Sequence, residues 1–156
     1  MTPAINLLKK LKIEHKVHSY EHDESYDSYG LEAADKLNVQ AQRVFKTLVV
    51  KLDSGALAVA ILPVDKKLSM KLVAKALSAK KAEMADKLEV QRSTGYVLGG
   101  VSPLGQKKRL KTVVDDSASE LPSIFVSAGK RGLEIELSCQ DLTSATQGIS
   151  ASITVR

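Results

Sequence analysis

A lysine inside an otherwise apolar run is the residue in this sequence with the clearest potential for chemistry. Lys46 lies within residues 44–50, where the alternation of a strand places it between apolar neighbours on one face. A partly buried ammonium group needs an anionic partner, because an unpaired buried charge is costly. A substrate phosphate could be that partner, and so could a carboxylate such as Glu134 or Glu136. The alternative interpretation is a lysine on an edge strand that reaches water.

A glycine-rich segment over residues 93–105 is the second feature that could do chemistry. Its four glycines allow backbone N–H groups to approach a ligand closely, for example an ester carbonyl or a phosphate. The segment matches neither a P-loop nor a dinucleotide-binding fingerprint. Residues 106–109 follow with the sequence QKKR, which adds a basic patch. The alternative is a long connection with tight turns.

Residues that could act as a nucleophile or hold a metal are poorly arranged. His15 and His18 point to opposite faces of an expected strand, and with His22 they do not form a convincing metal site. Cys139 lacks the surroundings of a reactive thiol, and no Ser–His–Asp order or nucleophile elbow occurs. Residues 127–132, a turn with glycines and two bases, are by themselves typical of a hairpin. We therefore expect no metal, no cofactor and no protein nucleophile.

Charge is distributed unevenly along the chain. The net charge is +5, but residues 66–111 hold twelve basic and three acidic side chains, a local net of +9. Residues 14–35 hold seven acidic side chains and Lys16 as their one basic side chain. A basic segment of this kind is typical of a surface that binds phosphate or nucleic acid, although a solvated helix face is the alternative.

Length and composition predict a single domain over residues 1–156. The chain is 44% hydrophobic and 26% charged, which is ordinary for a globular protein. Its longest apolar stretch, residues 56–64, is too short for a membrane helix, which needs ~20 residues. The N-terminus has no apolar signal core, so we expect a soluble, cytoplasmic protein.

The elements that must position these residues mix helices and strands. Apolar spacing and capping residues predict helices over residues 3–11, 31–37, 70–77, 87–94 and 141–147. Alternation and β-branched runs predict strands over residues 13–19, 43–52, 56–62, 110–114, 124–127, 133–137 and 149–155. Helices and strands do not alternate strictly. The order favours an α+β fold, with a mixed sheet that could close into a barrel, over a doubly wound fold.

Several motifs, in order over most of the chain, resemble the YbaK/EbsC family. They are MTPA at residues 1–4, YEHD at 20–23, FKTL at 45–48, KKAEMAD at 80–86, the whole of 91–110 and GKRGL at 129–133. The residues after Cys139 match more loosely. The resemblance implies a mixed, partly closed β-barrel with surrounding helices, like the editing domain inserted in bacterial prolyl-tRNA synthetases.

The resemblance also implies an activity. A family member is expected to be an aminoacyl-tRNA deacylase that edits in trans and removes cysteine from mischarged Cys-tRNA(Pro). Prolyl-tRNA synthetase makes this error because cysteine and proline have similar sizes, and it is an expected partner together with tRNA. The substrate thiol would attack its own ester carbonyl and form a thiolactone, so the enzyme would need no nucleophile of its own.

The resemblance carries roles over to particular residues. Lys46, Gly99 and Gly100 are the expected catalytic residues, with Lys46 near the phosphate or ribose of the terminal adenosine and the two glycines facing the ester carbonyl. The expected substrate-binding residues are Tyr20, Tyr29, Phe45, Thr47, Ser127, Gly129 and Glu134. The sequence departs from the family's usual residues at three positions: Tyr29 replaces phenylalanine, Ala128 replaces glycine and Glu134 replaces aspartate.

Two alternative functions remain compatible with the sequence. One is a related editing deacylase for another small residue, such as alanine on proline tRNA. The other is a non-catalytic module that only binds tRNA through the basic segment. The scarcity of aromatic residues, six in all, disfavours a broad platform for stacking single-stranded bases.

Overall fold

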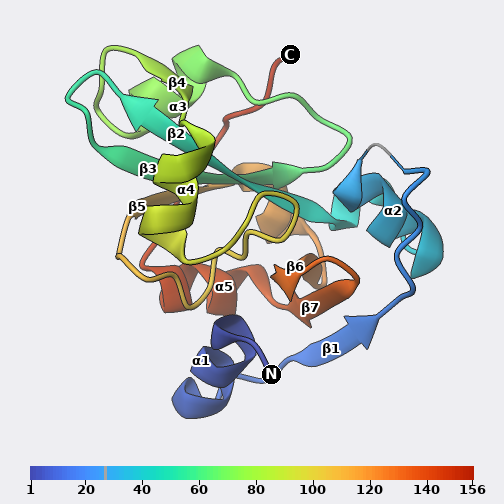
Figure 1. Cartoon of the computed structure of the whole chain (residues 1–156). Helices are drawn as coiled ribbons and strands as arrows, with labels where there is room; N and C mark the ends of the chain where they lie inside the picture. Colours follow the sequence, from blue (N-terminus) through green and yellow to red (C-terminus); the bar gives the residue numbers. More distant parts are fainter. Residues whose placement is uncertain (27) are drawn as a thin grey trace.

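A computed structural model describes residues 1–26 and 28–156, in which helices surround two β-sheets (Figure 1). Asp27, one of the seven acidic residues counted in segment 14–35, lies outside the described residues. The strands are β1 (Lys16–Ser19), β2 (Phe45–Leu52), β3 (Leu57–Pro63), β4 (Ala82–Met84), β5 (Lys111–Asp115), β6 (Ile124–Lys130), β7 (Leu133–Leu137) and β8 (Ile149–Ala151). The α-helices are α1 (Pro3–Leu11), α2 (Tyr29–Lys36), α3 (Met70–Ala76), α4 (Lys87–Thr94) and α5 (Cys139–Thr146). Two 3-10 helices cover Ala41–Arg43 and Asp116–Glu120.

The larger sheet has five strands in the order β4-β2-β3-β5-β8. β2 and β3 form the expected antiparallel hairpin, whereas β3 with β5 and β5 with β8 pair in parallel. β3 is buried on both faces: Val59 and Ile61 pack on one side, and Ala58 with Leu62 on the other. This burial explains its nearly continuous apolar sequence.

The smaller sheet has three antiparallel strands in the order β1-β7-β6. A register shift between Ser127 and Lys130 interrupts the pairing of β6 with β7 next to their turn. A single bridge between Val44 and Phe125 joins the two sheets. In Figure 1, this sheet lies with α1 and α5 below the five-stranded sheet, and their apolar side chains share a core that includes Leu8, which is fully buried.

Helix ends follow the capping residues seen in the sequence. Thr2, Ser69 and Asp86 accept hydrogen bonds from backbone N–H groups in the first turns of α1, α3 and α4. Gly95 ends α4 at φ 82°, a conformation that favours glycine. The side chain of Glu89 forms an ion pair with Lys51, with Nζ–O distances of 3.3 Å, and so helps to hold α4 against β2.

The expected α+β class with a mixed sheet is confirmed, and helix and strand positions are correct within a few residues. The short strand β4 was missed, because its three residues carry no strand pattern of their own and are recruited by pairing with residues 50–52. Within residues 1–26 and 28–156, the hydrogen bonds form two open sheets, so the partly closed barrel stays a prediction. No helix in the described part of the chain is long and apolar enough to cross a membrane.

Candidate functional site

A cavity of about 510 Å³ brings most of the predicted site residues together. It lies between α2, β2, the glycine-rich segment and the strands β6 and β7. The predicted residues that line it are Tyr20, Tyr29, Phe45, Lys46, Thr47, Gly99, Ser127 and Glu134. These residues come from six separate places along the chain, so only folding unites them. We call this space the reaction cavity.

At Lys46, strand β2 has a neighbouring strand on one side only, among the described residues. β3 pairs with it through Leu62, whereas β4 pairs only with residues 50–52. The side chain is half-buried, and burial lowers the pKa of its ammonium group while the charge of Asp65 opposes this shift. The apolar walls expected around it are present, since Val44 and Leu48 also line the cavity.

Neither carboxylate suggested as a partner for Lys46 forms an ion pair with it within the described residues. Glu136 is instead held by His18 at 2.9 Å and by Arg43 at 3.4 Å. The side chain of Glu134 lines the same cavity as Lys46, and within the described part of the chain it forms no ion pair or side-chain hydrogen bond. The cation of Lys46 is therefore available to an anionic ligand.

Glu134 is a buried acid without a countercharge in contact. Its residue is 7% exposed, and burial raises the pKa of its carboxyl group to about 8. Burial, assisted by the charge of Glu134, also raises the pKa of the Tyr20 hydroxyl to about 12. Close by in β2, the hydroxyl oxygen of Thr47 is buried without a hydrogen-bond partner in the described chain. Buried polar groups that lack partners are uncommon, and a bound ligand is one explanation for them.

Tyr29, Gly99 and Arg131 meet at the cavity wall. The guanidinium carbon of Arg131 lies 3.7 Å from the centroid of the Tyr29 ring. A Cβ atom added at Gly99, where φ is 94°, would come within 2.6 Å of Cζ of Tyr29. Glycine is therefore required at position 99 for a steric reason as well as a conformational one. The hydroxyl that distinguishes Tyr29 from phenylalanine lies on this contact.

Arg131 is a cavity residue that the sequence did not reveal. It lies in a predicted turn and in the motif GKRGL, but neither feature assigned it a role in the site. Its Nε donates to Glu32 at 3.3 Å, and its Nη2 donates to the carbonyl of Tyr26 at 3.2 Å. Ser28, Val64 and Leu98 also line the cavity and were not predicted.

Glu32 is the centre of a buried charge cluster, not part of a solvated acidic face. Its side chain is fully buried. It accepts hydrogen bonds from Nδ1 of His22 at 2.8 Å and from the N–H of Asp23 at 2.6 Å, and Nζ of Lys36 lies 3.4 Å away. With Arg131 these groups form what we call the Glu32 cluster. It holds α2, the segment before it and the β6–β7 turn together.

Gly100 and Gly129 do not line the cavity, unlike the other predicted residues. The N–H of Gly100 donates to the carbonyl of Val97 at 3.0 Å, so it already has a partner within its own loop. The N–H of Gly129 donates to Oγ of Ser127 at 3.1 Å and so orients that hydroxyl. Ala128 is fully buried in the core, so its methyl group does not alter the cavity rim.

The three histidines and the cysteine have other contacts. Nδ1 of His15 contacts the carbonyl of Ile13 at 2.8 Å, and His18 and His22 contact Glu136 and Glu32. Cys139 begins α5 and lies near Thr143, away from the reaction cavity. No group of three or more His, Cys, Asp or Glu side chains that could hold a metal occurs in the described ranges.

Comparison with known proteins places this chain in a family. The model of the aminoacyl-tRNA editing domain matches residues 24–145, which contain Lys46, the glycine-rich segment and Glu134. The chain belongs to the aminoacyl-tRNA editing domain family. As expected from the motifs, it is an aminoacyl-tRNA deacylase, a class of enzyme that cleaves the ester bond between an amino acid and tRNA.

Two curated relatives extend this result. EbsC of Enterococcus faecalis, named as a Cys-tRNA(Pro)/Cys-tRNA(Cys) deacylase, is 37% identical over 156 residues, which cover 99% of this chain and 94% of EbsC. YwhH of Bacillus subtilis, an uncharacterized protein, is 27% identical over 112 residues, which cover 72% of this chain and 71% of YwhH.

Solved structures share the fold of this editing domain. A hypothetical protein of 24% identity superposes with a TM-score of 0.87 and covers 98% of this chain and 99% of its own. A crystal structure described as a trans-editing enzyme for prolyl-tRNA synthetase also gives a TM-score of 0.87, at 19% identity, with 99% and 96% coverage. At these identities the likeness concerns the fold alone.

Proposed function

We propose that this editing domain removes cysteine from mischarged Cys-tRNA(Pro) and acts in trans. The observation that carries the proposal is the reaction cavity. Its walls include the half-buried cation of Lys46 and the buried carboxyl group of Glu134, which has no ion-pair partner in the described chain. No histidine or cysteine lines the cavity in the described chain. The hydroxyls of Ser127 and Thr47 line it without a histidine to activate them, which favours a substrate that carries its own nucleophile. The identity of the chain with EbsC supports cysteine as that substrate.

In the proposed reaction, the thiol sulfur of the substrate attacks the carbonyl carbon of its own ester. A carbon–sulfur bond forms and the carbon–oxygen bond to the ribose breaks. The thiol proton ends on the ribose oxygen, so the products are cysteine thiolactone and tRNA with a free terminal hydroxyl. The protein contributes orientation and electrostatic stabilisation to this intramolecular step.

Each cavity wall would have a distinct task in this reaction. Lys46 would bind the phosphate or ribose of the terminal adenosine, since its cation has no ion-pair partner in the described residues. Gly99 would let the backbone approach the ester, while Tyr20, Tyr29, Phe45, Thr47 and Ser127 would enclose the aminoacyl group. Glu134, with a pKa of about 8, is positioned to exchange a proton near neutral pH. We assign Gly100 and Gly129 supporting roles behind Gly99 and Ser127.

The proposal includes partners and architecture. We propose that prolyl-tRNA synthetase delivers the mischarged tRNA in the cytoplasm, where charged tRNA is used. We also propose that residues 1–156 act as one editing domain. The Val44–Phe125 bridge supports a partly closed barrel, because it links the two sheets beside the reaction cavity.

A panel of charged tRNAs tests this function. Purified protein is incubated with Cys-, Ser- and Ala-tRNA(Pro), with and without prolyl-tRNA synthetase, and release of the amino acid is measured. We expect rapid release of cysteine and sharply slower release of serine, because a hydroxyl is a weaker nucleophile than a thiol. Lys46→Ala should reduce cysteine release by roughly 100-fold or more if Lys46 stabilises the transition state.

Other results of the panel would overturn particular parts of the proposal. Equal rates for cysteine and serine would favour attack by water over attack by the thiol. Preferential release of alanine would indicate an editing deacylase for that residue. Tight, salt-sensitive tRNA binding with no release of any amino acid would indicate a non-catalytic tRNA-binding module.

A further inference from the structure

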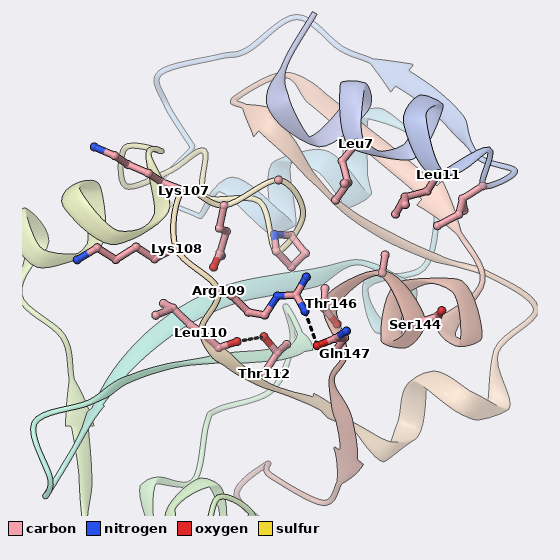
Figure 2. A pocket seen from close by; sticks show the side chains of 15 residues that line it. Leu7, Leu11, Lys107, Lys108, Arg109, Leu110, Thr112, Ser144, Thr146 and Gln147 are labelled. Atoms are coloured by element: carbon pink, nitrogen blue, oxygen red, sulfur yellow. Dashed lines mark hydrogen bonds between the residues drawn. The ribbon is translucent and has the colours of Figure 1, made fainter.

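A second hollow, separate from the reaction cavity, lies between α1, residues 103–110 and the end of α5. Its volume is about 590 Å³, and none of its lining residues lines the reaction cavity. Figure 2 shows Leu7 and Leu11 of α1 on one side, Thr146 and Gln147 on another, and Arg109 between them. We call it the Arg109 groove.

The groove is positively charged. Lys107, Lys108 and Arg109 line it, and the other residues around it include no carboxylate. Figure 2 shows Arg109 directed toward Gln147 inside the groove, whereas the side chains of Lys107 and Lys108 extend away from Arg109. Such an arrangement suits an anion that meets the guanidinium group, with the two lysines adding positive charge farther out.

The basic residues stand on a backbone that other elements hold in place. The N–H groups of Lys107 and Lys108 donate to the carbonyls of Thr94 and Ser93, at 3.0 and 2.9 Å. Gly105 packs so closely on α1 that an added Cβ would lie 2.6 Å from the backbone of Pro3. The charges are therefore held at a defined place and are not on a loose loop.

Arg109 itself is oriented by a side chain in an uncommon backbone conformation. Its Nη1 donates to Oε1 of Gln147. Gln147 ends α5 in the left-handed region at φ 54°, where most residues other than glycine are disfavoured. The hydrogen bond leaves other N–H groups of the guanidinium available, since arginine has five.

The opposite wall of the groove is apolar. Leu7, Leu11 and Ile13 line it, and Leu11 is 47% exposed. Hydroxyls of Ser144 and Thr146 lie on the remaining side. A ligand with an anionic group, polar hydroxyls and a flat apolar part matches these three walls, and a nucleotide unit of RNA has all three.

The chain segment shared by the groove and the reaction cavity indicates which molecule occupies the groove. The connection between α4 and β5 contributes to both spaces, with Leu98, Gly99 and Val101 in the reaction cavity and Pro103 and residues 105–110 in the groove. A substrate whose reactive end lies in the first space would meet the second space along the same connection. An acidic protein surface would satisfy the cations but not the apolar wall.

We infer that the Arg109 groove binds the RNA strand of the charged tRNA at a point away from its reactive end. The phosphate contacts Arg109, with Lys107 and Lys108 farther out, and the sugar or base lies toward Leu7 and Leu11. This inference rests on the proposed function, because it takes charged tRNA as the ligand. It adds a positioning site that contributes binding without touching the reacting atoms.

The test compares a long and a short substrate. Arg109→Ala and the pair Lys107→Ala/Lys108→Ala are assayed on full-length Cys-tRNA(Pro) and on the cysteinyl ester of a CCA trinucleotide. We expect Arg109→Ala to raise KM for the tRNA about tenfold with kcat unchanged, and to leave both constants unchanged for the trinucleotide. The salt dependence of tRNA binding should weaken by about one counterion for each lost phosphate contact.

Lys16→Ala is the matched control, because Lys16 is an exposed lysine of β1 that lines neither space. It loses the same charge and should behave as the unaltered protein. Wild-type constants for Arg109→Ala and for the double variant on both substrates would overturn the inference. An equal loss on both substrates would also overturn it and indicate a structural role for Arg109.

The remaining outcomes separate this inference from the proposed function. If the unaltered protein releases no amino acid from either substrate, the deacylase proposal fails. Binding of uncharged tRNA then tests whether the groove is an RNA site. Weaker tRNA binding by Arg109→Ala would then still support an RNA site, and unchanged binding would exclude it. An effect seen only when prolyl-tRNA synthetase is present would overturn the inference in favour of a protein-docking surface.

Discussion

Two buried carboxylates near the reaction cavity have opposite surroundings. Glu32 is fully buried and contacts His22, Lys36, Arg131 and the N–H of Asp23. Glu134 is almost as deeply buried, yet burial raises the pKa of its carboxyl group to about 8 because no cation balances it. Both are acids of similar exposure, so the difference lies entirely in their partners.

This difference separates residues that maintain the fold from residues reserved for a ligand. Partners at hydrogen-bond distance keep the Glu32 charge tolerable in the interior, and in return Glu32 holds three segments of the chain together. Glu134 and the unpaired hydroxyl of Thr47 contribute no such contacts, so their burial costs stability. Proteins accept such costs mainly at functional sites. Three substitutions test this contrast, from the largest expected effect to the smallest.

Removing the carboxylate of Glu32 should have the largest effect on stability. We expect Glu32→Ala to lower the free energy of unfolding by about 3–5 kcal/mol, because Arg131 and Lys36 would lose a buried counterion. Urea unfolding followed by circular dichroism measures this change. Glu32→Gln, which keeps the shape and one acceptor oxygen, should lose less. If Glu32→Ala has wild-type stability, the cluster does not hold these segments together.

Neutralising Glu134 should increase the stability of the folded protein, which is the opposite of the effect expected for Glu32→Ala. Its carboxyl group has a pKa of about 8 in the folded protein and 4.5 ordinarily, so between these values the folded state binds the extra proton. Its contribution to stability is therefore complete below pH 4.5 and is lost as pH rises toward 8, at up to about 1.4 kcal/mol per pH unit. We expect Glu134→Gln to flatten this slope and to be more stable than the unaltered protein at pH 8.

Unfolding measured at several pH values between 5 and 8 checks this expectation. Asp53→Asn is the control, because the pKa of the Asp53 carboxyl is lowered by hydrogen bonds from the N–H groups of Lys81 and Lys80 and not by a histidine. Its titration lies below this window, so the variant should keep the slope of the unaltered protein. A Glu134→Gln protein with an unchanged slope would show that Glu134 has a charged partner.

Replacing the unpaired hydroxyl of Thr47 should have the smallest effect. Thr47→Val preserves the branched shape in β2 and removes a buried oxygen that has no partner in the described chain, so we expect a gain of up to about 1 kcal/mol. Thr112→Val is the comparison, because the Thr112 hydroxyl donates to the carbonyl of Leu110 at 3.1 Å, and its loss should destabilise. Thermal unfolding of both variants measures the difference. Destabilisation by Thr47→Val would show that its hydroxyl has a stabilising contact.

The elements of the fold were predictable where their signals are local. Thr2, Ser69 and Asp86 predicted the starts of helices, and Gly95 predicted the end of one, because capping depends on neighbouring residues. The β2–β3 hairpin followed from two β-rich runs joined by a short polar turn. The parallel pairing of β3 with β5 was not predictable, since about fifty residues separate the two strands in sequence.

The residues of the reaction cavity were predictable from family motifs more than from the physical properties of single residues. Lys46 stood out by itself, because a charge in an apolar strand is conspicuous. Tyr20, Thr47 and Ser127 were identified only through resemblance to the family, because single polar residues carry no chemical signature. Arg131 and Glu32 escaped notice, since a base in a turn and an acid in an acidic segment both look solvated.

The sequence by itself determined the family, the local elements, and the place of a lysine within an apolar strand. These properties depend on residue order over short stretches, where spacing and composition are sufficient. Only the tertiary structure decided which buried charges are paired. Glu32 meets Arg131 across 99 positions of sequence, whereas Glu134 meets no cation in the described chain. Partnership between distant residues depends on how the segments pack, and this packing supplies cations to Glu32 and none to Glu134 within the described chain.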